Sequence, residues 1–391
     1  MGVAEYGSLS RGGAMEARDA RSSAGRPAIE DEAAAVLHVV GRVTASVQSF
    51  LGPMTHALIE SGSPQIVVLL DSPESGANLS QFDHRVQLVL VAMRKNGWLH
   101  WSALFRVVRE QMRSRRIAAV HFHGLKPWVI GAVLAGQRGQ RSAIYLSPHG
   151  SRLMWLLRLL PPVARLAAAA APKRVRGYIA SSMPDALQMT ASGMEPVLVE
   201  GAVADVFFAA SRHEARRPLV VAGNHRDVRS GVELASRIAV VLGAAELGLA
   251  FNWFGPIGKA SEARLAAANV ATFGSLDDDG LASRLSAGWV FIAPGGDTHF
   301  PILLAQAMAT GLACIVADTP MHRAMIEHEV TGLIYRTESE AQSHLTRVVD
   351  SPSLRHSLGD AAREAATRRF SVAHFRESLL PIYRSGESSR R

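Results

Sequence analysis

The fold is decided by residues 288–318, which read GWVFIAPGGDTHFPILLAQAMATGLACIVAD. The apolar run at 289–293 predicts a buried strand, and the glycine-bearing loop 295–299 follows it directly. The apolar segment 302–309 predicts a helix, bracketed by a proline before it and a glycine after it. A second buried strand is expected at 313–317. Strand, loop, helix and strand in this order predict a βαβ unit, whose two strands are parallel.

The same alternation of short apolar runs and helix-period segments extends to both sides of this unit. The other expected strands lie at 36–40, 66–70, 86–91, 118–122, 143–146, 178–180, 196–199, 219–222, 250–254 and 270–272. The other segments with helical periodicity lie at 47–60, 101–113, 130–135, 231–242, 281–286 and 353–384. Strands that alternate with helices of this length favour parallel sheets with helices on their faces.

A polar stretch at 208–217 divides the strands into two series and is typical of an interdomain linker. We therefore predict an α/β protein with two tandem, doubly wound Rossmann-like domains and a cleft between them. The expected parts are a disordered leader at 1–32, an N-terminal domain at 33–207, a linker at 208–217, a C-terminal domain at 218–365, and a crossing helix and tail at 366–391.

Composition excludes several classes of protein. Hydrophobic residues make up 48% of the 391 residues and charged residues 19%, which is a globular balance. Cys314 is the only cysteine, so an internal disulfide and a cysteine-based zinc cage are excluded. No apolar run is long enough to span a membrane, and residues 1–32 hold no apolar core of a secretory signal. We therefore expect a cytoplasmic protein.

The net charge of +8 favours an anionic partner. Nucleic acid is not predicted, because only 6% of the residues are aromatic and no basic stretch is interleaved with aromatic residues. Residues 152–176 combine leucines and a tryptophan with several cationic residues, which is typical of a helix lying on an anionic membrane surface. An ordinary helix packed on the sheet is the alternative.

Two patterns raise the question of a metal. His121 and His123 alternate along a strand and so face one side, but no third ligand has a suitable spacing in the sequence. The acidic triplet 277–279 precedes a helix, and capping of that helix explains it. We therefore predict no metal and no other cofactor.

The glycine-bearing loop offers a different kind of site. Loop 295–299 brings the N-terminus of the helix at 302–309 to the edge of the sheet. The first N–H groups of a helix have no partner within it, and its positive dipole end attracts anions. The combination suits a diphosphate.

The block 270–335 resembles the donor-binding domain of family 4 retaining glycosyltransferases, which have the GT-B fold. Segments on both sides of it are similar to that family in order and spacing. They are His121–Gly124, Ser147–Gly150, Val199–Phe207, Gly223–Gly231, and Phe370-Ser371 together with Tyr383. The resemblance covers about residues 35–385. It implies an acceptor-binding domain at 33–207 and a nucleotide-sugar-binding domain at 218–365.

The resemblance also implies the roles of individual residues. Arg226 and Arg229 are expected on the donor diphosphate and His149 near the transferred sugar, which makes these three the expected catalytic residues. Arg42 and His123 are expected on the acceptor side. The expected donor-binding residues are Gly223, Asn224, Gly296, Asp297, Thr298, His299, Phe300 and Gln306.

The sequence departs from the family's pattern of two glutamates eight positions apart. Gln306 replaces the second glutamate, and Thr298 stands eight positions earlier. Gln306 can still hydrogen-bond ribose hydroxyls, although it carries no charge. Thr298 supplies no carboxylate, and Asp297 is its neighbour. Asn224 stands where the family usually has an arginine.

The predicted function is metal-independent transfer of a sugar from a nucleotide-sugar donor to a glycan or lipid-linked acceptor, with retention, in cell-surface polysaccharide or glycolipid assembly. If residues 152–176 bind lipid, the enzyme is peripheral on the inner face of the membrane. A catalytically degenerate glycosyltransferase-fold partner or sugar-binding scaffold remains an alternative, as does a nucleotide-sugar epimerase. Nicotinamide chemistry is disfavoured because the GxGxxG fingerprint is absent at residues 41–44.

Overall fold

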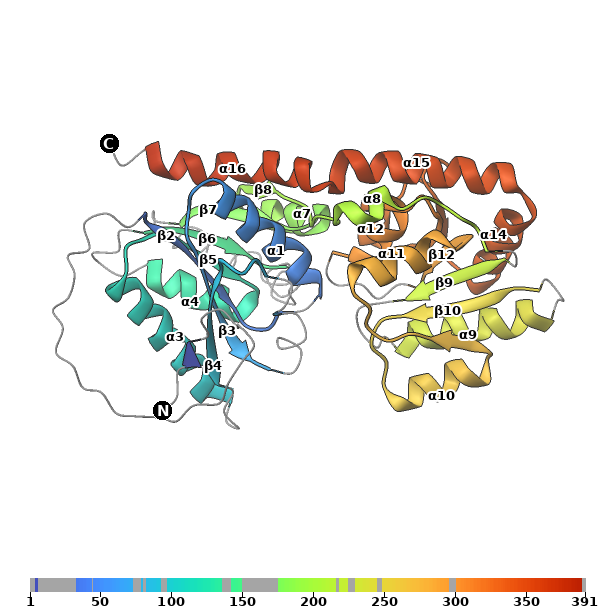
Figure 1. Cartoon of the computed structure of the whole chain (residues 1–391), viewed down its shortest axis with the longest axis horizontal. Coiled ribbons are helices and arrows are strands. Elements are labelled where there is room, and N and C mark those ends of the chain that lie inside the picture. The colour runs from blue at the N-terminus through green and yellow to red at the C-terminus, as the bar shows by residue number, and fades with distance from the viewer. Residues whose placement is uncertain are drawn as a thin grey trace, which may run out of the picture. The chain divides into compact units, whose positions relative to one another are not determined.

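The computed structural model describes most of the chain. The described residues are 4–5, 33–43, 45–72, 79, 82–92, 97–135, 142–149, 175–215, 218–223, 229–244, 248–294 and 300–388. They divide into two compact units (Figure 1). One unit comprises Met1–Thr44, Met54–Ser147 and Ala170–Gly177, and the other comprises Ala45–Pro53, Pro148–Ala169 and Tyr178–Arg391.

The first sheet contains eight strands. In spatial order they are β1 (Ala4–Glu5), β4 (Gln87–Ala92), β3 (Gln65–Asp71), β2 (Ala35–Val40), β5 (Ile117–His123), β6 (Ala143–Ser147), β7 (Val175–Ala180) and β8 (Pro196–Leu198). Adjacent strands from β4 to β6 pair in parallel, as do β7 and β8, whereas β1 is antiparallel to β4. Apart from Ala4–Glu5, the predicted leader 1–32 lies outside the described residues.

Helices connect these strands. They are α1 (Ala45–Glu60), α3 (Gly97–Ser114), α4 (Leu125–Ala135), α7 (Met183–Ala191) and α8 (Asp205–Ala209). Helix α3 packs against β3 and β4, and α4 packs against β5 and β6. All six residues of β2 are buried, as the apolar run predicted for a central parallel strand.

The second sheet contains six parallel strands. Their spatial order is β11 (Val270–Thr272), β10 (Ala250–Phe254), β9 (Leu219–Gly223), β12 (Val290–Ala293), β13 (Ala313–Ala317) and β14 (Leu333–Tyr335). The helices that follow these strands are α9 (Arg229–Ala244), α10 (Lys259–Ala267), α11 (Asp278–Ser286), α12 (Ile302–Ala309), α13 (Pro320–Met325), α14 (Glu338–Asp350), α15 (Pro352–Phe370) and α16 (Val372–Ser388).

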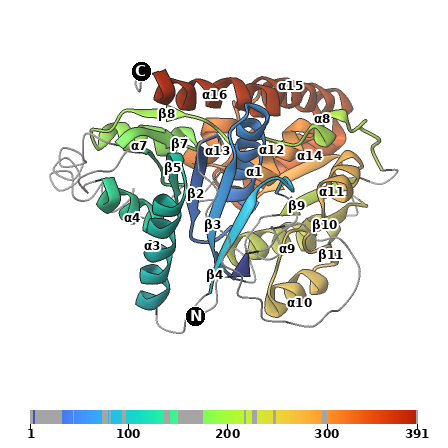
Figure 2. The ribbon, with the colours of Figure 1, turned by 60° about the vertical axis from the view of Figure 1, so that its left-hand side comes forward.

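Side chains on alternate positions of the second sheet enter two different hydrophobic clusters. Val220 and Ala222 of β9 pack with residues of α9, α10 and α14. Val221 packs in the cluster to which α11, α12 and α15 contribute. Successive strand residues point to opposite faces, so each face of the sheet is covered by its own set of helices. This is the doubly wound arrangement that the sequence predicted, and it is confirmed (Figures 1 and 2).

Both sheets have the same topology around their first strand. Counting β2 and β9 as first, the orders β4-β3-β2-β5-β6-β7 and β11-β10-β9-β12-β13-β14 both read 3-2-1-4-5-6. This is the order of dinucleotide-binding Rossmann domains, in which ligands bind at the carboxyl ends of the strands. The predicted boundaries at 207 and 218 fall between the last strand of the first sheet and the first strand of the second.

The helical periodicity predicted over 353–384 is confirmed with one interruption, because α15 ends at Phe370 and α16 begins at Val372 (Figures 1 and 2). Ser371 between them is extended, with φ −66° and ψ 150°, and forms an isolated bridge with Val203. The Val203 N–H donates to the Phe370 carbonyl oxygen at 2.8 Å. Pairing with another segment therefore interrupts the helix.

The predicted linker 208–217 is attached to α15. The buried Arg355 guanidinium donates to both carboxylate oxygens of Glu214 at 3.0 Å and to the Val348 carbonyl at 3.1 Å. Its Cζ also lies 3.9 Å from the centre of the Trp289 ring. These contacts of the buried Arg355 fix the position of Glu214 in the linker.

One strand of the second sheet was not predicted from the sequence. This strand is β14, whose three residues lie at the edge of the sheet. A Cβ at Gly332 would lie 2.6 Å from the Cys314 carbonyl oxygen, so a glycine is required where β14 approaches β13. None of the helices in the described ranges is both long and apolar enough to cross a membrane.

Candidate functional site

The carboxyl end of β9 is packed too closely for any residue except glycine. A Cβ at Gly223 would lie 2.4 Å from the Phe254 carbonyl oxygen and 2.7 Å from Cδ2 of Leu303. Phe254 ends β10 and Leu303 lies in the first turn of α12. Gly223 therefore brings the end of β9, the end of β10 and the start of α12 together.

A second close contact joins the next two elements at the same edge. A Cβ at Gly231, in the first turn of α9, would lie 2.9 Å from Cγ of Pro294, which follows β12. Since β9 and β12 are adjacent and parallel, α9 and α12 both begin at the carboxyl edge of the sheet. Two helix N-termini next to one another favour an anionic ligand.

Helix α12 presents a polar group within an otherwise apolar element. All eight of its residues are buried, and Gln306 is 6% exposed. The Gln306 Oε1 atom is buried and makes no hydrogen bond within the described part of the chain. Gln306 lies one turn after Leu303 and so on the same side of the helix as the contact with Gly223. A ligand hydroxyl would satisfy this acceptor.

Phe300 precedes α12 and belongs to the core. Its ring is 3% exposed and meets the Phe370 ring edge-on, with centroids 5.4 Å apart. A Cβ at Gly201 would lie 2.8 Å from Cδ1 of Phe300. These contacts anchor the entry to α12. The donor-binding role expected for Phe300 remains a prediction.

His149 has a backbone conformation that is uncommon for residues other than glycine. Its φ is 50°, its side chain is 5% exposed, and its ring meets the Phe50 ring edge-on at 4.9 Å. Phe50 in turn contacts Phe375 of α16, with ring centroids 5.5 Å apart. Packing therefore holds a strained residue, and such residues are common at functional sites. Its catalytic role remains a prediction.

The two expected acceptor-side residues lie in different surroundings. Arg42 is exposed after β2. His123 is 2% exposed and is the last residue of β5, and its Nε2 is 3.1 Å from Nδ1 of His38. The prediction that His121 and His123 alternate along a strand is confirmed, because pairing with β2 continues through His123.

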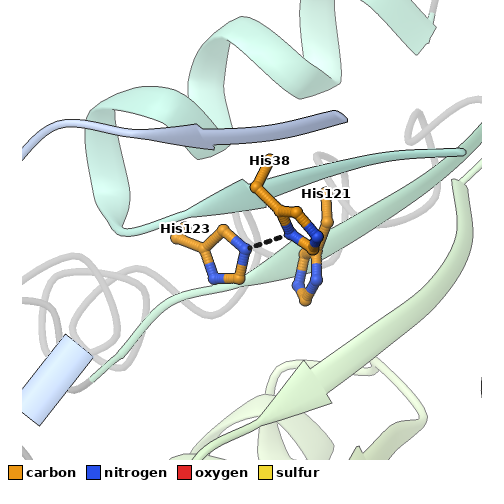
Figure 3. A group of neighbouring side chains, drawn as sticks. All are labelled: His38, His121 and His123. Atoms are coloured by element: carbon orange, nitrogen blue, oxygen red, sulfur yellow. Dashed lines mark hydrogen bonds between the residues drawn. The ribbon is translucent and has the colours of Figure 1, made fainter. Parts of the chain in front are cut away.

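His38 supplies a third imidazole beside His121 and His123 that was not predicted from the sequence. This residue lies on β2 opposite His121 of β5, and the three imidazoles of His38, His121 and His123 gather on one face (Figure 3). One ligand nitrogen from each lies within 4.8 Å of the others. The statement that no third ligand is suitably placed is therefore wrong, because sheet pairing brings together residues that are far apart in sequence.

Burial controls the charge of His38. Desolvation lowers the pKa of its imidazole from 6.5 to about 4, and its hydrogen bond with Gln65 opposes that shift in part. His38 is therefore neutral at pH 7. Gln65 was also not singled out in the sequence, since a polar residue at the start of a strand is an ordinary feature.

Several expected site residues lie outside the described residues. They are Asn224, Arg226, Gly296, Asp297, Thr298 and His299, together with nearly all of the membrane candidate 152–176. Arg229 is the first residue of α9.

The helix-capping interpretation of 277–279 is confirmed, because the Asp277 side chain accepts a hydrogen bond from the Gly280 N–H at 2.9 Å. Burial and the neighbouring Asp279 and Asp277 raise the pKa of Asp278.

Comparison with known proteins finds a family match within the part of the chain that forms the second sheet. Residues 241–365 match the family model described as glycosyl transferases group 1. The chain is 30% identical over 124 residues to a phosphatidyl-myo-inositol mannosyltransferase of Mycobacterium tuberculosis and to one of Mycobacterium bovis. This match covers 30% of this chain and 32% of each relative, so the chain spans about a third of the length of the curated relatives it matches.

Solved structures resemble the chain over most of its length. A sucrose-phosphate synthase from Thermosynechococcus elongatus has a TM-score of 0.72 at 13% identity, over 91% of this chain and 100% of that one. HepE from Anabaena, solved with UDP-glucose, has a TM-score of 0.69 at 13% identity, over 90% and 99%. The lipopolysaccharide outer core galactosyltransferase WaaB has a TM-score of 0.63 at 14% identity, over 91% and 99%.

These matches confirm the resemblance to glycosyltransferases of the GT-B fold, and retention remains a prediction. The chain has the GT-B fold, and residues 241–365 match the model of group 1 glycosyl transferases. That segment includes β12, α12 and Gln306, and it ends within α15.

Proposed function

We propose that this protein transfers a sugar from a nucleotide-sugar donor to a glycan or lipid-linked acceptor, with retention of configuration and without a metal in the transfer step. The assembly of cell-surface polysaccharide or glycolipid is the proposed process. Support comes from the family match at 241–365 and from structural relatives that include a complex with UDP-glucose and a galactosyltransferase.

One observation carries the proposal. Within the matched segment, α12 places the buried Oε1 of Gln306, which has no partner in the described part of the chain, on the helix face that meets Gly223. An unsatisfied buried amide oxygen costs about 1–3 kcal/mol. A ribose hydroxyl of the donor would remove this penalty, and the helix starts at the same edge suit its diphosphate.

The chemistry then depends on charge that develops on the departing diphosphate. Preorganised cations and helix N–H groups stabilise such charge most effectively, because they need no reorganisation during the reaction. We assign this role to Arg226, Arg229 and the N–H groups at the start of α12. We assign to His149 a position beside the transferred sugar or the acceptor hydroxyl.

Thermal unfolding with nucleotides tests the donor site. The purified protein is heated with UDP, GDP, ADP or dTDP in turn. A nucleotide at a hundred times its dissociation constant should stabilise the fold by about 2.7 kcal/mol. A shift with one nucleotide would identify the donor class. If none of the four shifts the unfolding temperature, the degenerate scaffold becomes the better interpretation.

The variant Arg229→Ala tests the diphosphate assignment. Its transfer rate should fall at least about tenfold, which corresponds to about 1.4 kcal/mol of lost transition-state stabilisation. Arg237→Ala is the matched control, since Arg237 lies on the same helix and pairs with Glu338 at 2.7 Å. Equal rates for Arg229→Ala and the control would contradict the assignment.

Thr298→Glu tests whether the missing carboxylate limits the rate. The rate of sugar transfer should rise if a carboxylate at position 298 takes part in the reaction. No gain would mean that the loop uses another group. Sedimentation with anionic vesicles tests whether residues 152–176 bind an anionic membrane surface. The natural chain is compared with a variant in which the cationic residues of 152–176 are replaced by glutamine.

A further inference from the structure

Three buried imidazoles form a cluster in the first sheet that the proposed transfer reaction does not use. His38 and His121 are 0% exposed, and His123 is 2% exposed. His38 comes from the centre of β2, and the other two come from β5 (Figure 3). Three imidazoles placed together inside a sheet require partners for their ring nitrogens, because polar groups are expensive to bury.

The orientation of the His38 ring follows from its hydrogen bonds. The Gln65 side-chain Nε2 donates to the Ser63 carbonyl oxygen at 2.7 Å, so its Oε1 faces His38 and accepts from Nε2 of that ring at 2.8 Å. His38 therefore carries its proton on Nε2. Its Nδ1 carries a lone pair and accepts a hydrogen bond from Nε2 of His123 at 3.1 Å, and a metal ion would take the place of that shared proton.

This is the arrangement of a metal-binding histidine and its outer partner. A histidine that binds a metal with one nitrogen usually donates the other N–H to a carbonyl, a carboxylate or water, and this partner fixes the tautomer. Gln65 has that role for His38. His121 has a second such partner, since its Nε2 lies 2.8 Å from the buried Oγ of Ser147.

The spacing of the rings suits one small ion. Two nitrogens bound to one tetrahedral ion at 2.0–2.1 Å are about 3.3 Å apart, and their ring centroids are about 5 Å apart. The nitrogens of His38 and His123 are separated by 3.1 Å. The centroids of His38 lie 5.9 Å from His121 and 5.3 Å from His123, while the His121–His123 pair, at 4.0 Å, must open by about 1 Å.

We propose that His38, His121 and His123 bind one divalent transition-metal ion, with Zn²⁺ as the best match. Neutral imidazole nitrogens favour Zn²⁺ and its transition-metal neighbours over Mg²⁺ and Ca²⁺, which prefer oxygen ligands. The ion links β2 and β5, the two central strands of the first sheet. The proposal does not depend on the proposed transferase activity, since the site lies in the other compact unit from α9 and α12.

Zinc itself is the probe for the test. The full chain is unfolded with a chelator, refolded with and without Zn²⁺, freed of unbound ions and analysed for metal by mass spectrometry. We expect one Zn²⁺ per chain and a higher unfolding temperature. Co²⁺ in place of Zn²⁺ should give the intense visible absorption of a tetrahedral site. Less than about a tenth of an ion per chain would overturn the proposal.

Variants show whether the bound ion is at this site. His38→Gln and His121→Gln should each abolish tight binding. His328→Gln is the matched control, because His328 and His344 form a histidine pair at 5.9 Å in the other unit, with His328 exposed. Tight Zn²⁺ binding that survives in the His38 and His121 variants, or is lost in the control, would overturn the assignment.

A milder variant covers the case in which the histidine variants do not fold. Gln65→Leu removes only the outer partner of His38 and should weaken Zn²⁺ affinity by about ten- to a hundred-fold. The Co²⁺ absorption of the natural chain provides a second measurement that needs no variant. Unchanged affinity in Gln65→Leu, together with a six-coordinate Co²⁺ spectrum, would contradict the proposed geometry.

Discussion

The central strand pairs of the two sheets, β2–β5 and β9–β12, have the same place in the same topology but different interiors. In the second sheet the pairs Val221↔Phe291 and Ala222↔Ile292 are apolar and enter the hydrophobic clusters. In the first sheet the pair His38↔His121 puts two imidazoles at the equivalent place. One topology therefore accommodates an apolar interior or a polar one, provided that the polar groups have partners.

The glycines at the carboxyl ends of β9 and β2, Gly223 and Gly41, show the same contrast. At Gly223, a Cβ would meet the Phe254 carbonyl oxygen at 2.4 Å. At Gly41, it would meet side chains, with the tip of the Trp101 ring nearest at 3.2 Å. A backbone atom of a central strand cannot retreat, whereas a side chain can turn. The close approach required for the candidate donor site is thus confined to the second sheet.

The largest expected effect on stability tests this difference between the two glycines. Gly223→Ala should destabilise the second sheet by about 3 kcal/mol or more, because the new methyl group overlaps the backbone of β10. Gly41→Ala is the matched control and should cost less than about 1 kcal/mol. Denaturant unfolding of both variants measures the difference. Equal destabilisation would show that the two junctions are packed alike.

The next largest effect is a loss of stability at low pH, which should be confined to the first sheet. Below pH 6.5 the unfolded chain protonates His38, while the folded chain resists protonation until about pH 4. The unfolded state then binds more protons, so stability falls as the pH falls through this window. The expected loss at pH 5 relative to pH 7 is about 2 kcal/mol.

Hydrogen exchange of the β2 and β5 amides, with a chelator present, measures this loss. The amides of β9 and β12 are the internal control, because neither strand contains a titratable side chain. His38→Leu should remove most of the pH dependence from β2. An equal response of both sheets to acid would contradict the origin assigned to it.

The smallest expected effect on stability comes from removing the Ser147 hydroxyl. Ser147→Ala removes the partner of His121 Nε2 and should destabilise the first sheet by about 1 kcal/mol. Ser236→Ala is the control in the second unit, since the buried Ser236 hydroxyl donates to the Val232 carbonyl of its own helix at 2.8 Å. That carbonyl keeps its helical partner, so the control should change stability by less than about 0.5 kcal/mol. A smaller loss for Ser147→Ala than for the control would show that His121 does not need its outer partner.

Local patterns in the sequence were sufficient for most of the fold. Strands such as Ala250–Phe254 and Ala313–Ala317 have the predicted bounds, because an apolar run between turn residues is a local signal. The cap at Asp277 was predicted for the same reason. The interruption at Ser371 was not, since it depends on pairing with Val203, far away in the sequence.

For the candidate donor site, the sequence indicated the loop and helix at 295–309 and the position of Gln306. It gave no sign that the Gln306 oxygen is buried and unpartnered in the described part of the chain, because burial depends on what packs around α12. Nor did it indicate why Gly223 is a glycine. Its neighbours, Phe254 and Leu303, come from two other elements.

The sequence by itself determined the alternation of strands and helices, the two series and the family resemblance, because these follow from local periodicity and motif order. Only the tertiary structure decided which buried residues meet. His38 and His123 are 85 positions apart, yet their nitrogens lie within 3.1 Å of each other. The physical reason is that the pairing register of β2 and β5, which sets these neighbours, is a property of the assembled sheet and not of either strand alone.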